Sequence, residues 1–254
     1  MNKRLLITYL IFLISSVSYS QLLNNASSAQ LRTDVRHIPN TVDSSLLTGR
    51  ILSPMPLTFA GLGEKEIALT FDDGPNPINT PIVLETLKKY GVKATFFVLG
   101  ENAKRYPELI KQIVAEGHNL ANHTWSHKVY QKEQTPQEFK EDIIRTQKLL
   151  VELVGEKNVE PFFRFPTGFG AGIKEAQNML SELGFANFYW SMSAHDSRTK
   201  DPKVTLKTSI DMIKQFKKGL FLCHDVRPHT AAMLPLFLDQ LIEQGYTTIQ
   251  FSSK

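Results

Sequence analysis

From residue 64 onward, short apolar runs alternate with longer segments in which apolar side chains recur three and four positions apart. The first run, at 66–71, is mostly apolar and stops at Asp73-Gly74-Pro75, residues that favour a turn, so it predicts a strand. The segment at 80–90 has helical spacing and predicts a helix that stops at Gly91. The same reasoning predicts strands at 94–99, 119–121, 162–165, 188–191, 220–223 and 247–251, and helices at 107–116, 135–153, 173–183, 204–216 and 231–244.

This alternation, repeated about seven times, indicates parallel strands joined by crossover helices, as in a barrel or a doubly wound sheet. No GxGxxG or GxxxxGK[ST] motif occurs, so a nucleotide-binding sheet has no support. In a barrel, functional groups lie where strands end and loops begin. Several titratable side chains stand at such positions: Asp72, Asp73, His123, His127, Arg164, Asp196 and His224. We therefore expect them to converge at one end of the sheet.

Composition narrows the class of protein. The 254 residues are 42% hydrophobic and 21% charged, which fits a globular chain with one domain of α/β-barrel size or two small domains. The net charge of +4 is mild and no dense Lys/Arg run occurs, so a nucleic-acid partner is not expected. The single cysteine, Cys223, excludes an intramolecular disulfide and a multi-cysteine metal site.

The N-terminus has the pattern of a secretory signal. Lys3 and Arg4 precede an uncharged, mostly apolar run of about 13 residues, and small residues follow at Ser18 and Ser20. The run is shorter than the ~20 residues that span a bilayer, although an uncleaved anchor is the alternative. We predict a signal peptide at 1–20, no membrane span after its cleavage, and a secreted or periplasmic protein of the bacterial cell envelope.

Residues 21–63 show no strong hydrophobic period and are rich in Ser, Thr, Asn and Leu. We interpret them as an N-terminal extension or linker. The catalytic domain is then expected at 64–254.

A metal site is suggested by His123 and His127, because imidazoles four positions apart on a helical turn can hold one ion. Two structural histidines at this spacing are the alternative. A third, carboxylate ligand would suit zinc, and Asp72 and Asp73 offer two carboxylates, of which one could bind metal and the other act as a base. By itself, Asp-Asp-Gly-Pro favours a plain turn, because Asp, Gly and Pro are all turn residues.

Other candidates also have structural alternatives. His224 could be an ordinary strand-end residue, and Arg164 could form a structural ion pair, because burying it without a carboxylate partner would be costly. Trp125 and Trp190 could pack in the core or stack on a sugar ring, and the core is favoured for Trp190. Cys223 is expected to be a small buried side chain.

In this order the motifs resemble the NodB-type polysaccharide deacetylases, carbohydrate esterase family 4, over roughly residues 64–251. The family's first motif matches as Thr-Phe-Asp-Asp-Gly-Pro at 70–75 and the second as His-Thr-Trp-Ser-His at 123–127. Lys-Ala-Thr-Phe-Phe-Val at 93–98 is also typical. The third motif matches as Arg-Phe-Pro at 164–166 and the fifth as Leu-Cys-His at 222–224.

The resemblance implies a distorted (β/α) barrel that removes N-acetyl, sometimes O-acetyl, groups from an amino-sugar polymer such as peptidoglycan, exopolysaccharide or chitin. It implies a divalent metal, usually zinc, held by Asp73, His123 and His127. The other implied roles are base for Asp72, acid for His224, orientation of Asp72 for Arg164, and an oxyanion-binding N–H at Thr167. We further expect Leu222 to line the acetyl pocket, Asp196 to raise the pKa of His224, and Trp125 to contact the sugar.

Two motifs depart from the family pattern. The fourth usually reads Asp-x-x-Asp-Trp, but here Ser193 and Ser197 replace the first Asp and the Trp, while Asp196 is kept. Thr167 replaces an aromatic residue of the third motif. These losses leave open which polymer is the substrate and which acyl group is removed. They also motivate a second hypothesis, a catalytically idle glycan-binding protein. A metal-binding structural envelope protein is a third, although it would need neither Asp72 nor His224.

Overall fold

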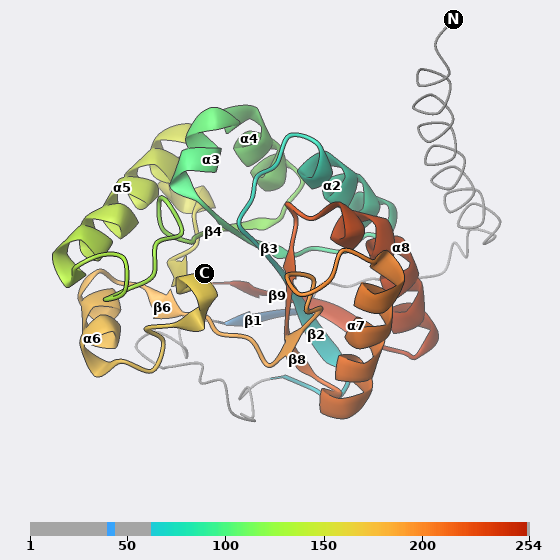
Figure 1. Ribbon diagram of the computed structural model, residues 1–254. Coiled ribbons are helices and arrows are strands. Elements are labelled where there is room, and N and C mark those ends of the chain that lie inside the picture. Colours follow the sequence, from blue (N-terminus) through green and yellow to red (C-terminus); the bar gives the residue numbers. More distant parts are fainter. Residues whose placement is uncertain (1–39, 44–61, 253–254) are drawn as a thin grey trace, which may run out of the picture. The chain divides into compact units, whose positions relative to one another are not determined.

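The computed structural model describes residues 40–43 and 62–252, and the structural statements below concern these residues (Figure 1). The predicted signal peptide at 1–20 lies outside them, as does the predicted extension at 21–63 apart from residues 40–43 and 62–63. None of the described helices is both long and apolar enough to cross a membrane.

The described strands form one sheet in which every neighbouring pair is parallel. The strand order is β1-β9-β2-β3-β4-β5-β6, with β8 paired to β2 and β7 paired to β8. β2 pairs with β8 along most of its length, with β9 at its beginning and with β3 at its end, so β9 and β3 share one edge of β2. The strands are β1 (Asn40–Asp43), β2 (Glu66–Asp72), β3 (Thr95–Val98), β4 (Asn119–Asn122), β5 (Phe162–Phe163), β6 (Ala186–Asn187), β7 (Met192–Ser193), β8 (Gly219–His224) and β9 (Thr247–Ser252).

The helices that connect these strands lie around the outside of the curled sheet (Figure 1). The sheet is a half-barrel, which confirms the predicted α/β class and the distorted (β/α) barrel. The helices are α2 (Asn79–Lys89), α3 (Gly100–Arg105), α4 (Pro107–Ala115), α5 (Pro136–Val154), α6 (Lys174–Glu182), α7 (Pro202–Phe216) and α8 (Pro228–Glu243).

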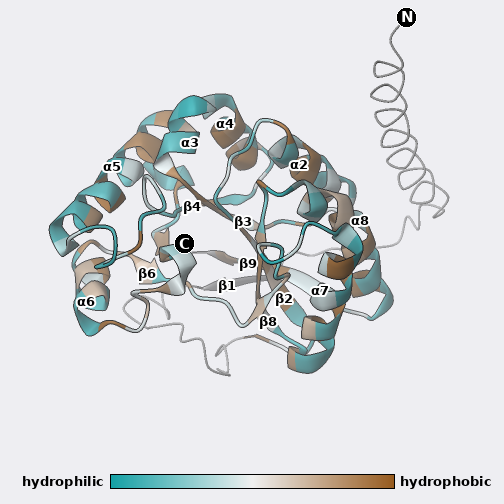
Figure 2. Cartoon of the chain, in the orientation of Figure 1, coloured by the Kyte–Doolittle hydropathy of each residue, from teal (hydrophilic) through white to brown (hydrophobic). Residues whose placement is uncertain are grey.

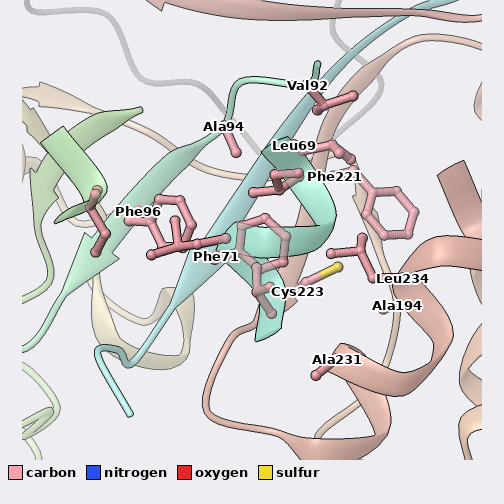
Figure 3. Close-up of a cluster of buried hydrophobic side chains, with 14 of the residues drawn as sticks. Leu69, Phe71, Val92, Ala94, Phe96, Ala194, Phe221, Cys223, Ala231 and Leu234 are labelled. Atoms are coloured by element: carbon pink, nitrogen blue, oxygen red, sulfur yellow. The ribbon is translucent and has the colours of Figure 1, made fainter. Parts of the chain in front are cut away.

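Side chains alternate between the two faces of the sheet, and two of the three apolar clusters among the described residues show this division. The outer core lies between the sheet and the helices, and Figure 3 shows Phe71 of β2 and Cys223 of β8 within it, next to Ala231 and Leu234 of α8. The inner core contains no helix residue: Ala68, Phe97, Ala121, Phe162, Phe188, Leu220, Ile249 and Phe251 belong to it. Figure 2 shows hydrophobic colours on central strands such as β3, and helices such as α5 on which hydrophilic and hydrophobic residues alternate.

This alternation decides where the polar strand-end residues point. Ala68 is an inner residue and Phe71 an outer one, so Asp72 at the end of β2 points inward. By the same count His224, four positions after the inner residue Leu220, and Arg164, two positions after the inner residue Phe162, also point inward. The site therefore forms at the carboxyl end of the inner face.

Most predicted helices are present with boundaries shifted by a few residues. α5 is an example: Thr135 caps its N-terminus, since its hydroxyl accepts from the Glu138 N–H while the Glu138 side chain accepts from the Thr135 N–H. Two described elements were not predicted. One is the short helix α3, and the other is the strand β1, which lies within the predicted extension at 21–63 and pairs with β9.

The strand predicted at 188–191 is wrong. Two short strands, β6 and β7, flank this stretch instead. The Arg164 guanidinium donates Nε–H to the carbonyl of Phe188 at 3.2 Å and Nη2–H to the carbonyl of Tyr189 at 3.3 Å. These carbonyls therefore accept hydrogen bonds from the buried arginine instead of from a neighbouring strand.

Candidate active site

Adjacent strands bring the predicted base, Asp72, and the predicted acid, His224, together. β2 and β8 are in register, with Asp72 opposite His224 and Thr70 opposite Leu222. In a parallel ladder, neighbours in register point to the same face, so all four side chains face inward. The structure thus places Leu222, buried at 5% exposure, on the same face as His224 and two residues before it.

Asp73, His123 and His127 lie together beside this pair. The Nε2 atoms of His123 and His127 are 3.5 Å and 3.4 Å from Oδ1 of Asp73. One potential ligand atom from each residue lies within 4.8 Å of the other two. Among the described residues, this is the cluster of His, Cys, Asp and Glu side chains that could hold a metal ion.

The hydrogen bonds around the cluster fit a cation. Nδ1 of His123 lies 2.8 Å from the carbonyl oxygen of Arg164, which can only accept, so Nδ1 carries a proton and, in the neutral ring, the lone pair of Nε2 faces Asp73. Oδ1 of Asp73 is buried and accepts no hydrogen bond from the described residues. With His123 in its neutral form, the electron pairs of Nε2 and of Oδ1 face one another, an arrangement that a bound divalent ion would suit.

Burial raises the pKa of Asp73. Contact with His123 and the nearby imidazoles of His224 and His127 lower it by more, so the net pKa lies well below its usual range. Burial lowers the pKa of His127, and the neighbouring His123 adds to this shift. Both shifts favour the ligand forms, an ionised carboxylate and a neutral imidazole.

Asp72 is held by a buried arginine. Arg164 is fully buried and donates Nη1–H to Oδ1 of Asp72 and to Oγ1 of Thr70, each at 2.7 Å. Burial lowers the pKa of Arg164, and the charge of Asp72 opposes that shift. The guanidinium also lies 4.2 Å from the ring centroid of Phe97. These contacts fix the orientation of the Asp72 carboxylate.

His224 is held by a buried aspartate. Nδ1 of His224 lies 2.7 Å from Oδ1 of Asp196, while Oδ2 of Asp196 accepts from the backbone N–H of His224 at 2.8 Å and from the Thr230 hydroxyl at 2.6 Å. Burial lowers the pKa of His224, but hydrogen bonding to Asp196 and its charge raise it more, to about 9. The ring is therefore an imidazolium near neutral pH, and its Nε2 lies 4.0 Å from Oδ2 of Asp73.

The turn after β5 carries Thr167 in a left-handed conformation, with φ 58°. Gly168 follows at φ 75°, and a Cβ there would come within 2.8 Å of both Tyr189 and Trp190. These two rings are stacked at 4.1 Å between centroids. A tight aromatic pair therefore supports the turn that presents the Thr167 backbone.

Trp125 contacts other parts of the protein. The guanidinium of Arg145 lies 3.5 Å from its ring centroid, and a Cβ at Gly100 would come within 2.4 Å of the ring. The predicted contact of Trp125 with sugar stays a prediction. At the altered fourth motif, Ser193 is buried and its hydroxyl accepts from the backbone N–H of His195, while Ser197 is exposed.

Sequence reasoning assigned no role to four residues around the site. His229 and Thr230 bond Asp196, the former through the Asp196 carbonyl at 2.7 Å. Asn102 donates to the carbonyl of Asp73 at 2.8 Å. Asp225 accepts from the Thr80 hydroxyl, and burial raises its pKa to about 7. Only Asp225 had a sequence signal, since it follows His224.

The fold and the cluster define a curled parallel α/β half-barrel with titratable groups and a potential metal site at the carboxyl end of its strands. Residues 60–188 match the polysaccharide deacetylase family, and the chain belongs to that family, as its motifs indicated.

Curated relatives agree. The peptidoglycan-N-acetylglucosamine deacetylase PgdA of Listeria monocytogenes is 37% identical over 186 residues, which cover 72% of this chain and 37% of the relative. This chain therefore spans well under half the length of that protein. A peptidoglycan-N-acetylglucosamine deacetylase of Bacillus cereus is 35% identical over 195 residues, 74% of this chain and 87% of the relative.

Solved structures share the fold. A peptidoglycan deacetylase of Bdellovibrio bacteriovorus superposes with a TM-score of 0.74 at 27% identity, covering 89% of this chain and 62% of that one. A CE4 family pseudoenzyme of Bacillus anthracis superposes with a TM-score of 0.66 at 24% identity, covering 78% of this chain and 67% of that one. At that identity the second likeness concerns the fold alone.

Proposed function

We propose that this chain is a metal-dependent hydrolase that removes N-acetyl groups from an amino-sugar polymer, with peptidoglycan as the first candidate. One observation carries the proposal: Asp72, bonded to Arg164, and His224, bonded to Asp196, flank the same potential metal cluster. The register of β2 and β8 places Asp72 opposite His224, with Asp73, His123 and His127 next to them.

Asp72 is the proposed general base. Hydrolysis of an amide needs a water molecule that loses a proton as it attacks the acetyl carbon. Arg164 binds Oδ1 of Asp72, whereas Oδ2 faces the cluster at 3.7 Å from Nε2 of His123. Oδ2 is therefore the oxygen that accepts the proton.

His224 is the proposed general acid. The sugar nitrogen leaves as an amine only when it receives a proton. Asp196 holds Nδ1 of His224 at 2.7 Å and keeps the ring charged, so Nε2 carries the proton that is donated. The base and the acid thus lie on neighbouring strands and serve the same bond from two sides.

Asp73, His123 and His127 are the residues that would hold the metal, with zinc the first candidate because two imidazoles and a carboxylate suit it. When bound, such an ion supplies Lewis acidity, which polarises the acetyl carbonyl and acidifies a water molecule. We assign the oxyanion contact to the backbone N–H of Thr167 and the methyl pocket to Leu222, as the motifs suggest.

The substrate class follows from the relatives. Two of them are named for peptidoglycan N-acetylglucosamine, and we extend that class to this chain. Peptidoglycan lies outside the cytoplasm, which agrees with the signal peptide that we propose at 1–20. The altered Thr167 and Ser197 positions leave exopolysaccharide and chitin oligomers as further candidates.

The test is acetate release from purified peptidoglycan and from N-acetylglucosamine oligomers. We expect release by the wild-type protein, loss after chelation and recovery on addition of zinc. Asp72→Asn keeps the metal ligands but removes the base, so it should retain zinc while acetate release falls about 100-fold or more. His123→Ala is the matched variant and should lose zinc and turnover together. Full activity of Asp72→Asn would refute the base assignment.

The second candidate function is an idle glycan-binding protein. The loss of aromatic or charged residues at Ser193, Ser197 and Thr167 favours it, and the fold is shared with a pseudoenzyme. Such a protein would bind peptidoglycan and release no acetate in the presence of zinc. The intact Arg164–Asp72 and Asp196–His224 pairs argue for the enzyme.

A further inference from the structure

The side chain of Asp73 is positioned through its backbone. Its Oδ1 is buried and accepts no hydrogen bond from the described residues, so that oxygen has no side-chain or backbone donor to restrain it. The residue adopts a left-handed conformation with φ 73°. Residues other than glycine adopt such a conformation uncommonly, and although Asp does so more readily than most, neighbouring contacts help to hold it. What holds the Asp73 backbone therefore decides where the carboxylate lies.

Of the other two residues of the cluster, His123 is restrained at its ring and His127, like Asp73, at its backbone. Nδ1 of His123 donates to the Arg164 carbonyl at 2.8 Å, which sets its ring orientation. The backbone N–H of His127 donates to the Thr124 hydroxyl at 3.1 Å. Outer contacts of this kind orient metal ligands and tune affinity.

The segment at 99–102 connects the two loops that carry the cluster. Leu99 donates its N–H to the carbonyl of Gly74 at 3.0 Å, and Gly100 donates its N–H to the carbonyl of Thr124 at 3.0 Å. Glu101 donates its N–H to the carbonyl of Trp125 at 3.1 Å. The start of α3 is thus bonded both to the turn after β2 and to the loop that runs from His123 to His127.

Asn102 adds the contact to Asp73 itself. Its Nδ2–H donates to the Asp73 carbonyl oxygen at 2.8 Å. The opposite side of the turn is closed by Asp225, whose carboxylate packs so tightly on Gly74 that a Cβ there would come within 2.4 Å of both oxygens. The turn is therefore held from two sides, and Asn102 is the side chain that bonds the Asp73 backbone.

We propose that Asn102 is a positioning residue that holds Asp73 at the distance from His123 and His127 that metal binding needs. This inference rests on the metal site of the proposed function. Without the amide donor, the turn can relax away from its left-handed conformation, and the carboxylate leaves the two imidazoles. Metal affinity then falls, although all three ligands remain.

The experiment measures zinc affinity of the full chain by competition with a chelator, together with the visible spectrum of the cobalt-substituted protein. Asn102→Ala and Asn102→Leu both remove the donor, and leucine keeps most of the volume. We expect about tenfold weaker zinc binding in both and a changed cobalt spectrum. Turnover should recover at saturating zinc.

Asn158→Ala is the matched control. Asn158 is also half-buried and also donates its amide to a backbone carbonyl, that of Val154 at 2.7 Å, far from the cluster along the chain. It should keep wild-type zinc affinity. Equal affinity in all variants, equal losses in the Asn102 and Asn158 variants, or failure of both Asn102 variants to fold would overturn the inference.

The two proposals fail separately. A wild-type protein that binds zinc tightly and releases no acetate would refute the enzymatic function, while the difference in zinc affinity between the variants would still decide the role of Asn102.

Discussion

The two sides of the site are built from the same kind of pair but behave differently. On one side Arg164 bonds Asp72, and on the other Asp196 bonds His224, each at 2.7 Å between the paired atoms. The arginine carries a permanent charge, whereas the histidine gains and loses its proton as the pH changes. The Arg164 side is therefore a fixed support, and the His224 side is adjustable.

The difference extends to the surroundings. Arg164 is 0% exposed and bonds Thr70 and two backbone carbonyls besides Asp72. The side chain of His224 is 15% exposed, and its charge depends mainly on Asp196, which is itself held by Thr230, with smaller contributions from Asp73 and Asp72. Removing a partner should thus affect stability most on the arginine side and pH dependence most on the histidine side.

Arg164→Met should have the largest effect. It leaves the Asp72 carboxylate buried without its cation, which costs about 3–5 kcal/mol of unfolding free energy. That is a large part of the stability of a typical domain. Urea unfolding of the metal-free protein measures it. The double variant Asp72→Asn with Arg164→Met should regain part of the loss, because no uncompensated charge remains. A loss below about 1 kcal/mol in the single variant would contradict the comparison.

Asp196→Asn should have an intermediate effect that depends on pH. Without the charge of Asp196, burial lowers the pKa of His224 from about 9, and less of the acid is protonated at neutral pH. We expect the alkaline limb of kcat to move to lower pH and kcat near neutrality to fall about 10–100-fold. An unchanged alkaline limb would exclude His224 as the acid.

Asp196→Asn should also change how the free energy of unfolding depends on pH. The pKa of His224, about 9 when folded, lies above its ordinary value of 6.5, so the ion pair stabilises the protein fully below pH 6.5 and loses this effect as the pH rises through about 9. The difference in unfolding free energy between wild type and Asp196→Asn should shrink over that interval.

Thr230→Val should have the smallest effect. The hydroxyl is one of the donors to Asp196, and the bond to the backbone N–H of His224 remains. We expect a loss of about 1.5–3 kcal/mol and a small shift of the alkaline limb, because a buried bond to a charged group is removed. Thr230→Ser keeps the donor and should resemble wild type in the same pH profile and urea titration.

Local patterns suggested a shared site. His123 and His127 are close in sequence, and Asp72 and Asp73 follow a strand whose carboxyl end lies at the same end of the sheet, but the choice of Asp73 as the third ligand came from the family resemblance. The stretch at 188–191 shows the limit of such patterns. Its apolar and aromatic residues favour a strand, but the buried guanidinium of Arg164 takes two of its carbonyls.

The amino-acid sequence by itself determined the parallel α/β class, the family and the residues that gather at the strand ends, because strand and helix periods and motif spacing act within short segments. The tertiary structure alone decided that Asp72 lies opposite His224, that Thr230 supports Asp196, and that Asn102 holds the backbone of Asp73. These relations join segments far apart along the chain. They depend on strand register and on which polar groups remain to be satisfied after the cores have packed.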